Sequence, residues 1–382
     1  MRPVHEEKLK DVNSAKSDDL LFSQRSSYAP SQPGEVRIGP ILAIPAVLTA
    51  RGIRPDLAFA RAGIDGKLFR DPESRLPLEA VGRLLDICAA LTRCPHFGLL
   101  VGERFNLDAF GAIGALMRNS TNVNHALGVL LRHLYLHDRR ASAVLLAPDK
   151  SSVLLGYSIF RHGMPGSDQI YDAAITIAYK IVRELCGPSF TPLQIQFAHG
   201  RPGNVAPFAH LFRSNVLFDA DLSGVVVDAS WLSRPIKGAD ADLCKRLEKA
   251  ILDAGADCPK SFAERVECAI HQLVPTGPTS AEAIGHLLAI SERTLRRRLK
   301  DEGKSLQELI NQTRYDLARQ LLSNTQMPVS KIAAALQFGD PNAFSRAFRT
   351  WAGLSPTQWR SLELKRGEEA RPTTTTSSEK RI

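Results

Sequence analysis

Apolar residues recur along this chain with two different spacings. Helical spacing predicts helices, while short apolar runs bounded by turn residues predict strands. Runs at 144–146 and 153–155 flank the sequence Pro148-Asp149-Lys150 and predict a β-hairpin. The other elements expected before residue 235 are helices at 78–91 and 167–186 and strands at 195–198 and 225–228. This part of the chain is therefore predicted to be a mixed α/β domain.

After Pro235 the strand patterns stop and only helical patterns continue. Amphipathic helices are predicted at 240–254 and 261–273, and short turns separate the helices expected from there to residue 364. The predicted fold class is multidomain, with a mixed α/β N-terminal domain followed by an all-α domain. Polar segments at both ends of the chain are expected to be disordered.

The all-α region contains an internal repeat. The sequence SERTLRRRLK at 291–300 aligns with DPNAFSRAFR at 340–349. Each copy is predicted to be the second helix of a helix-turn-helix unit. A helix at 305–323 is expected to join the two units. The apolar anchors that coincide are Leu295 with Phe344 and Leu299 with Phe348.

Residues that can accept an unpaired backbone N–H mark five helix starts in this region. Ser291 and Asp340 open the second helix of each unit. Three further starts have the pattern of a capping box, in which the first and fourth residues cap each other's backbone. These pairs are Thr279 with Glu282, Ser305 with Glu308, and Ser355 with Gln358.

The second helix of each unit is expected to have an apolar face and an opposite polar face, because residues advance ~100° per position. The polar faces consist of Arg293, Arg296, Arg297 and Lys300 in the first unit and of Asn342, Ser345, Arg346 and Arg349 in the second. Arginine can bind guanine and asparagine can bind adenine through two hydrogen bonds, and lysine neutralises phosphate. A repeated face of this kind favours DNA recognition over a merely solvated helix surface.

Charge and composition agree with this interpretation. The 382 residues have a net charge of +9. Of this charge, +6 lies between Thr279 and Arg366, which contain 14 Lys or Arg and 8 Asp or Glu. The longest apolar stretch, at 38–50, is shorter than the ~20 residues of a membrane helix. The charged N-terminus does not match an export signal, so a cytoplasmic protein without membrane association is expected. Six scattered cysteines predict reduced thiols.

Longer motifs surround the repeated helices. They are IGHLLAISERTLRRRLKDEG at 284–303, RYDLA at 314–318, KIA at 331–333, LQF at 336–338, FSRAF at 344–348, WAG at 351–353 and SPTQWR at 355–360. With these motifs the region resembles the AraC/XylS family of bacterial transcription regulators. The resemblance implies a seven-helix DNA-binding domain with two helix-turn-helix units joined by a linker helix. Departures are Ala289 and Gln337, where the family commonly has glycine, and Gly285, where it has alanine.

The resemblance also places DNA contacts on the two polar faces. The implied base-reading residues are Arg293, Arg296, Arg297, Asn342 and Arg346. Phosphate contacts are expected from Lys300, Ser345 and Arg349.

Short motifs in the first half carry a second resemblance. They are FGLLVG at 97–102, FGAIG at 110–114 and NVLFD at 215–219. This half is similar to the arabinose-binding-type N-terminal domain of the branch that includes ornithine-utilisation regulators, which implies sensing of a small molecule that the sequence does not identify. The expected segments are a lead-in at 1–35, an effector-binding and dimerisation domain at 36–235, a linker helix region at 236–260, the DNA-binding domain at 261–364 and a tail at 365–382.

Other candidate chemistry is weaker. His133 and His137 are one helical turn apart and could share a metal with His125 or Asp138, but no third ligand is well spaced, so no metal site is expected. Cys94-Pro95-His96 does not match the cysteine motif of DNA-repair methyltransferases. No catalytic residues and no cofactor are expected.

The predicted function is sequence-specific transcription regulation, with activation as the expected sign and a small-molecule effector in the N-terminal domain as the control. The expected partners are promoter DNA, the effector, RNA polymerase and a second copy of the chain. A ligand-independent DNA-binding protein is the alternative, followed by an enzyme with a DNA-targeting module and a catalytic site within residues 36–235.

Overall fold

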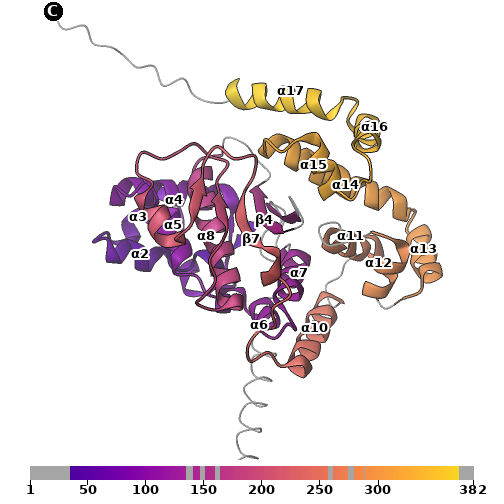
Figure 1. The fold of residues 1–382 in the computed structure, drawn as a ribbon, viewed down its shortest axis with the longest axis horizontal. Coiled ribbons are helices and arrows are strands. Elements are labelled where there is room, and N and C mark those ends of the chain that lie inside the picture. The colour runs from indigo at the N-terminus through magenta and orange to yellow at the C-terminus, as the bar shows by residue number, and fades with distance from the viewer. Residues whose placement is uncertain are drawn as a thin grey trace, which may run out of the picture.

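The computed structural model of the chain describes residues 35–134, 141–146, 151–159, 164–256, 261–273, 279–288 and 290–369. Helices surround a five-stranded sheet in the N-terminal half, and a helical C-terminal half follows (Figure 1). This confirms the predicted fold class. No single helix in the described ranges is long and apolar enough to cross a membrane. The hairpin turn at 148–150, His137, Asp138, Ala289 and most of both tails lie outside the described residues.

The first helices pack around an apolar core of their own, in which Ile38, Ile44, Leu48 and Leu84 are fully buried. Strand β1 (Glu35–Arg37) pairs antiparallel with β2 (Arg75–Pro77) at the edge of this core. The helices that precede the large sheet in the chain are η2 (Gly39–Ile41), α2 (Ile44–Ala50), α3 (Pro55–Ala62), η3 (Gly66–Arg70), α4 (Leu78–Thr92), α5 (Phe97–Glu103), η4 (Leu107–Phe110), α6 (Ala112–Arg118) and α7 (Val123–His133), of which η4, α6 and α7 pack in the second core. Only α4 among them was expected from the sequence.

The large sheet has the strand order β3-β4-β7-β5-β6. Its strands are β3 (Ala141–Leu146), β4 (Ser152–Ile159), β5 (Gln194–Gln196), β6 (Asn215–Leu217) and β7 (Ser223–Asp228). Antiparallel pairing of β3 with β4 confirms the predicted hairpin, and β5 and β7 are the other two predicted strands. Strand β6 runs parallel to β5 across the short helix α9 (Ala206–Phe212) and was not predicted, because three residues give little periodicity.

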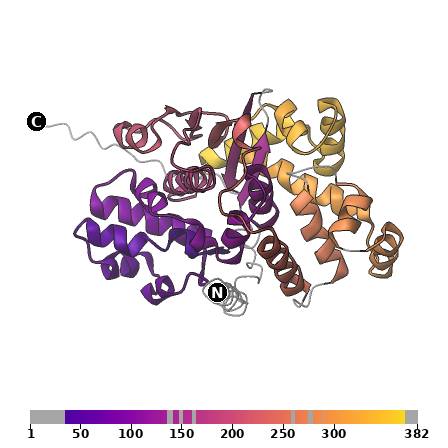
Figure 2. The same ribbon diagram turned by 60° about the horizontal axis from the view of Figure 1, so that its bottom comes forward.

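Both faces of this sheet are covered. Side chains alternate between the two faces of a strand, so Leu155 and Val225 join the core of the N-terminal half while Val144 and Leu154 join the core of the C-terminal helices. Figure 2 shows the sheet between the indigo N-terminal helices and the orange C-terminal helices. This two-sided burial explains why the strands are apolar at successive positions rather than at alternate ones.

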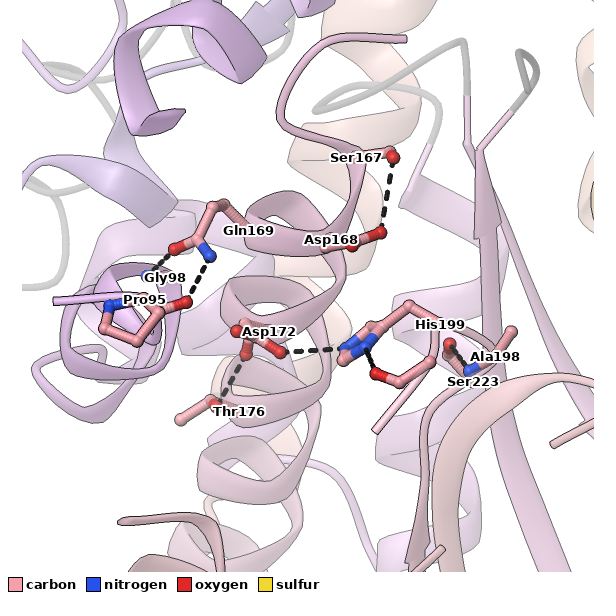
Figure 3. A network of polar contacts seen from close by, with 11 residues as sticks. Pro95, Gly98, Ser167, Asp168, Gln169, Asp172, Thr176, Ala198, His199 and Ser223 are labelled. Atoms are coloured by element: carbon pink, nitrogen blue, oxygen red, sulfur yellow. Dashed lines mark hydrogen bonds and ion pairs between the residues drawn. The ribbon is translucent and has the colours of Figure 1, made fainter. Parts of the chain in front are cut away.

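Helix α8 (Ser167–Cys186) passes through the N-terminal half and has the range that the sequence predicted. It packs closely against α5. The Gln169 amide accepts the Gly98 backbone N–H at 2.8 Å and donates to the Pro95 carbonyl at 2.6 Å (Figure 3). A Cβ on Gly98 would lie only 2.1 Å from the Gln169 carbonyl oxygen, and one on Gly102 would lie 2.6 Å from the Thr176 Cβ. The glycines of the FGLLVG motif therefore permit this close approach.

Replacing Gly98 by alanine is expected to reduce the free energy of unfolding by about 1–3 kcal/mol, because the new methyl group must push α5 and α8 apart. Gly128 on α7 provides the control, since its added Cβ would meet only the end of the Arg132 side chain. Gly128→Ala should be neutral or stabilising by up to ~1 kcal/mol. Chemical denaturation measures both changes, and equal midpoints for the two variants would contradict the prediction.

The other polar residues of α8 connect it to the sheet. Asp172 Oδ1 lies 3.0 Å from His199 Nε2, and both side chains are almost fully buried (Figure 3). Burial raises the pKa of Asp172. Burial also opposes the charged form of His199, but the contact with Asp172 outweighs this effect and raises the pKa of the imidazole. The pair fixes α8 to the segment that follows β5.

In the described residues of the C-terminal half, all regular elements are helices. Its helices are α10 (Ala241–Ala256), α11 (Phe262–Leu273), α12 (Ala281–Leu287), α13 (Glu292–Asp301), α14 (Leu306–Asn324), α15 (Val329–Ala335), α16 (Pro341–Ala352) and α17 (Pro356–Glu369). Helix α14 contacts the sheet directly, because Gln320 Nε2 donates to the Ser158 carbonyl at 2.9 Å in a buried hydrogen bond. A second connection runs from the Gln326 backbone N–H to the Asp221 carbonyl, also at 2.9 Å.

Candidate nucleic-acid interface

Helices α12 and α13 form the first helix-turn-helix unit that the repeat predicted. Ser291 caps α13 by accepting the Thr294 backbone N–H at 3.2 Å. Leu295 and Leu299 are buried in the core of the domain. The predicted contact residues Arg293, Arg296, Arg297 and Lys300 are all exposed on the remaining surface of the helix.

Helices α15 and α16 form the second unit. Asp340 caps α16 through the backbone N–H groups of Asn342 and Ala343, as the sequence predicted. Phe344 and Phe348 are fully buried behind the helix. Among the predicted contact residues, Asn342, Arg346 and Arg349 are exposed, whereas Ser345 is half-buried.

Local contacts distinguish the members of these two faces. The guanidinium of Arg296 forms an ion pair with Glu292 at 2.8 Å, although both side chains are well exposed. The Ser345 hydroxyl donates to the Pro341 carbonyl at 2.9 Å, so its own proton is already used within the helix. Arg298 belongs to neither face, because its guanidinium lies 5.5 Å from the centre of the Phe262 ring.

The helix starts agree with the sequence at four of the five expected positions. Ser305 and Glu308 form the predicted capping box, and Ser355 with Gln358 makes the same reciprocal pair of contacts. The exception is Thr279, because Ser280 caps α12 by accepting the Ala283 N–H. Thr279 is instead buried and accepts a hydrogen bond from Arg314 at 3.1 Å.

The turns show how the departures from the family pattern are accommodated. Gln337 has φ of 62° and so adopts the left-handed conformation that favours glycine. Such a conformation costs a non-glycine residue roughly 1–2 kcal/mol. Gly285 permits a tight first turn, since a Cβ there would lie 2.7 Å from the Ile290 carbonyl oxygen.

Two arginines that the sequence did not single out hold the units around α14. Arg314 donates to Thr279 before the first unit, and its guanidinium lies 5.0 Å from the centre of the Phe338 ring in the second. Burial lowers the pKa of Arg314. Arg360 on α17 donates to the Leu322 carbonyl at 3.3 Å, near the end of α14, where a cation is favourable. The two units are thus linked through α14 by buried or half-buried contacts.

Glu302 was also missed by sequence reasoning. Its carboxylate accepts the backbone N–H groups of Phe262 and Ala263 at 2.7 and 2.8 Å, and so caps α11 from the end of α13. Negative charge at a helix N-terminus is stabilising. The capped residues are 39 and 40 positions away, which is why no local capping pattern reveals the contact.

Comparison with known proteins identifies the family. A model described as the arabinose-binding domain of AraC transcription regulators matches residues 52–236, and a helix-turn-helix domain model matches residues 284–361. The transcriptional regulator VirS of Mycobacterium tuberculosis is 30% identical over 311 residues, which cover 81% of this chain and 92% of VirS. The chain belongs to the AraC family of transcription regulators.

Two further relatives refine this assignment. The ornithine utilization regulator of Pseudomonas aeruginosa is 27% identical over 315 residues, which are 81% of this chain and 91% of that protein. The branch expected from the N-terminal motifs is thereby confirmed. The transcriptional activator RhaS of Escherichia fergusonii is 39% identical over 92 residues, or 24% of this chain and 31% of RhaS. This AraC-family member is a DNA-binding transcription regulator with an N-terminal ligand-binding domain.

Among the described residues of this AraC-family protein, the candidate ligands His125 and His133 have different surroundings. His125 lies 3.4 Å from Glu248, while His133 is buried. No group of three or more His, Cys, Asp or Glu side chains within the described ranges is arranged to hold a metal ion.

Burial of His133 makes stability depend on pH. Burial, together with the nearby charge of Arg132, lowers the pKa of His133 to about 3. The unfolded chain takes up a proton near pH ~6.5 that the folded chain does not accept, so stability falls as the pH falls below that value. The expected loss between pH 7 and pH 5 is about 2 kcal/mol from this residue.

Denaturation of wild type and His133→Leu across this pH range measures the effect. The variant should lack the His133 contribution to the pH dependence, whereas the exposed His210→Leu should retain it. An identical pH dependence for wild type and His133→Leu would contradict the assignment.

Proposed function

We propose that this regulator reads promoter DNA through α13 and α16. Base contacts are assigned to Arg293, Arg296, Arg297, Asn342 and Arg346, and phosphate contacts to Lys300, Ser345 and Arg349. To donate to a phosphate oxygen, the Ser345 hydroxyl must release the Pro341 carbonyl. The observation that carries the proposal is the repeated arrangement, in which apolar anchors are buried on one side and cationic or amide side chains are exposed on the other. Helix α14 has 19 residues and spans ~28 Å, close to the ~34 Å turn of B-form DNA. Entry into successive segments of the major groove is consistent with this length.

Regulation is proposed to depend on a small-molecule effector in the domain at 36–235, which also forms the homodimer. The linker region at 236–260 connects it to the DNA-binding domain at 261–364. The proposed outcome is activation of transcription through RNA polymerase, and the protein is proposed to act in the cytoplasm. The sign of regulation is supported by the similarity to RhaS, which is named a transcriptional activator.

Mobility-shift assays test the proposal. The full chain should retain at least one DNA fragment from the intergenic regions around its own gene, at modest ionic strength and in the presence of excess unrelated DNA. Retention should weaken steeply with salt, because phosphate neutralisation releases counterions. Failure to retain any such fragment selectively would overturn the proposed recognition.

A further inference from the structure

A cavity of about 130 Å³ lies within the N-terminal half, at the boundary between its two apolar cores. Val81 and Leu85 of α4 line one side and belong to the first core, whereas Leu130 of α7 and Leu155 of β4 belong to the second. A molecule in this cavity would therefore contact both cores at once.

Small residues create this space. Ala173, Ala174 and Ala178 line the cavity from α8, and Ala143 and Gly156 line it from the hairpin of β3 and β4. Protein interiors are densely packed and contain few voids larger than a water molecule. An unfilled cavity of this size lowers the free energy of unfolding, and a bound molecule would restore the lost contacts.

The cavity is held open from the opposite side of α8. Gln169 is hydrogen-bonded to the backbone before and within α5, and Asp172 contacts His199 (Figure 3). These contacts fix the position of α8 relative to α5 and the sheet. The helix therefore cannot shift into the cavity without breaking buried polar contacts.

The chemistry of the wall restricts the ligand. Arg37 is a charged residue in the wall, but its guanidinium is paired with the Glu73 carboxylate, with Nε at 2.9 Å from Oε2, and is almost fully buried. Among the described residues that line the cavity, an anion would therefore find no free counter-charge. Apart from Arg37 and Tyr157, the lining side chains are aliphatic or aromatic hydrocarbons and proline. A sugar would lose the hydration of its hydroxyl groups without gaining enough hydrogen bonds in return.

We propose that this cavity is the effector site of the regulator and that it binds a small, uncharged, apolar molecule about the size of one aromatic ring. The inference rests on the proposed function and gives the effector a chemical class. The size is consistent with benzene binding in an engineered apolar cavity of ~150 Å³. This class of ligand differs from arabinose, the sugar in the description of the matched family model.

The strands that line the cavity also contact the DNA-binding domain. Ala143 and Leu155 face the cavity, while their neighbours Val144 and Leu154 pack in the core of the C-terminal helices. The carbonyl of Ser158, farther along β4, accepts the hydrogen bond from Gln320 on α14. An effector that orders or displaces β3 and β4 thus acts directly on the surface against which α14 and α15 pack.

Binding of three probes to the full chain tests the site. Toluene should bind and raise the thermal denaturation midpoint, whereas benzoate, with the same ring and a charge, and arabinose should do neither at equal concentration. Ala178→Leu on α8 fills the cavity and should weaken toluene binding at least tenfold, as should Ala143→Leu on β3. Ala90→Leu, on an exposed position of α4 outside the cavity, should bind toluene like wild type. Equal binding of toluene and arabinose, or equal binding by Ala178→Leu and Ala90→Leu, would overturn the inference.

Hydrogen exchange and mobility shifts complete the test. Toluene should slow amide exchange in β3 and β4 and change it in α14, and an effect confined to α4 and α8 would overturn the proposed transmission. DNA retention by wild type without toluene is measured in parallel. If DNA is retained but toluene does not bind, the effector inference fails alone, whereas toluene binding without DNA retention overturns the proposed function and leaves the cavity as a ligand site.

Discussion

Replacing Arg297 by alanine is expected to weaken binding to the specific DNA site about 5- to 150-fold, or ~1–3 kcal/mol, and to relax base preference at one position. The expectation follows from the exposed guanidinium on α13, opposite the buried Leu295 and Leu299. Arg346→Ala should have the same effect through the second unit, at a different base. Quantitative footprinting and mobility shifts on a set of single-base operator variants measure both the affinity and the lost preference.

Two neighbours on α13 provide matched controls. Arg298→Ala removes the same charge from the same helix, but this guanidinium lies over Phe262 and should leave base preference unchanged. Lys300→Ala should weaken binding to all sequences alike and reduce the salt slope by about 1. A footprint that Arg297→Ala leaves intact, with unchanged preference at every position, would show that this face does not read bases.

Phe348→Ala is expected to reduce the free energy of unfolding by about 3–5 kcal/mol, because it leaves a large cavity in the core of the C-terminal domain. The Phe348 ring is fully buried and packs against the rings of Tyr315, Phe344 and Trp359, with centroid distances of 5.8, 5.8 and 5.9 Å. These partners lie on α14, α16 and α17, so one substitution loosens three helices. Loss of DNA binding by this variant would follow from unfolding and would not report on recognition.

Chemical denaturation monitored by circular dichroism measures this loss. Leu362 on α17 is 39% exposed, and Leu362→Ala should change stability by no more than ~0.5 kcal/mol. If Phe348→Ala and Leu362→Ala denature at the same midpoint, the packing described for α16 is wrong.

The helix caps and the helix faces of the DNA-binding region could be predicted from the sequence, because they depend on neighbouring residues. The caps at Ser291, Ser305 and Asp340 satisfy backbone groups within three residues of themselves, so their patterns are present in the sequence. Buried and exposed positions on α13 and α16 follow helical geometry in the same way. Thr279 was misassigned because the adjacent Ser280 is an equally good cap, and only the distant Arg314 determines which of the two turns inward.

The N-terminal half was less predictable. The short elements β1, β2, β6 and α9 show little periodicity, and their places depend on pairing with distant segments. The DNA contacts themselves stay a prediction, since exposure of Arg297 or Asn342 is a condition for recognition and not a demonstration of it. No sequence pattern indicated the cavity, because the alanines at 143 and 178 come to line the same space only after β3 and α8 have packed.

By itself the sequence determined the two helix-turn-helix units, the caps of their second helices at Ser291 and Asp340 and their polar faces, because these depend on interactions within a turn or two of helix. The tertiary structure alone decided the capping of α11 by Glu302, the packing of α14 on the sheet through Gln320 and Ser158, and the cavity between the two apolar cores. Each of these joins residues about 40 to 160 positions apart, and long-range packing leaves no local periodicity for a sequence to display.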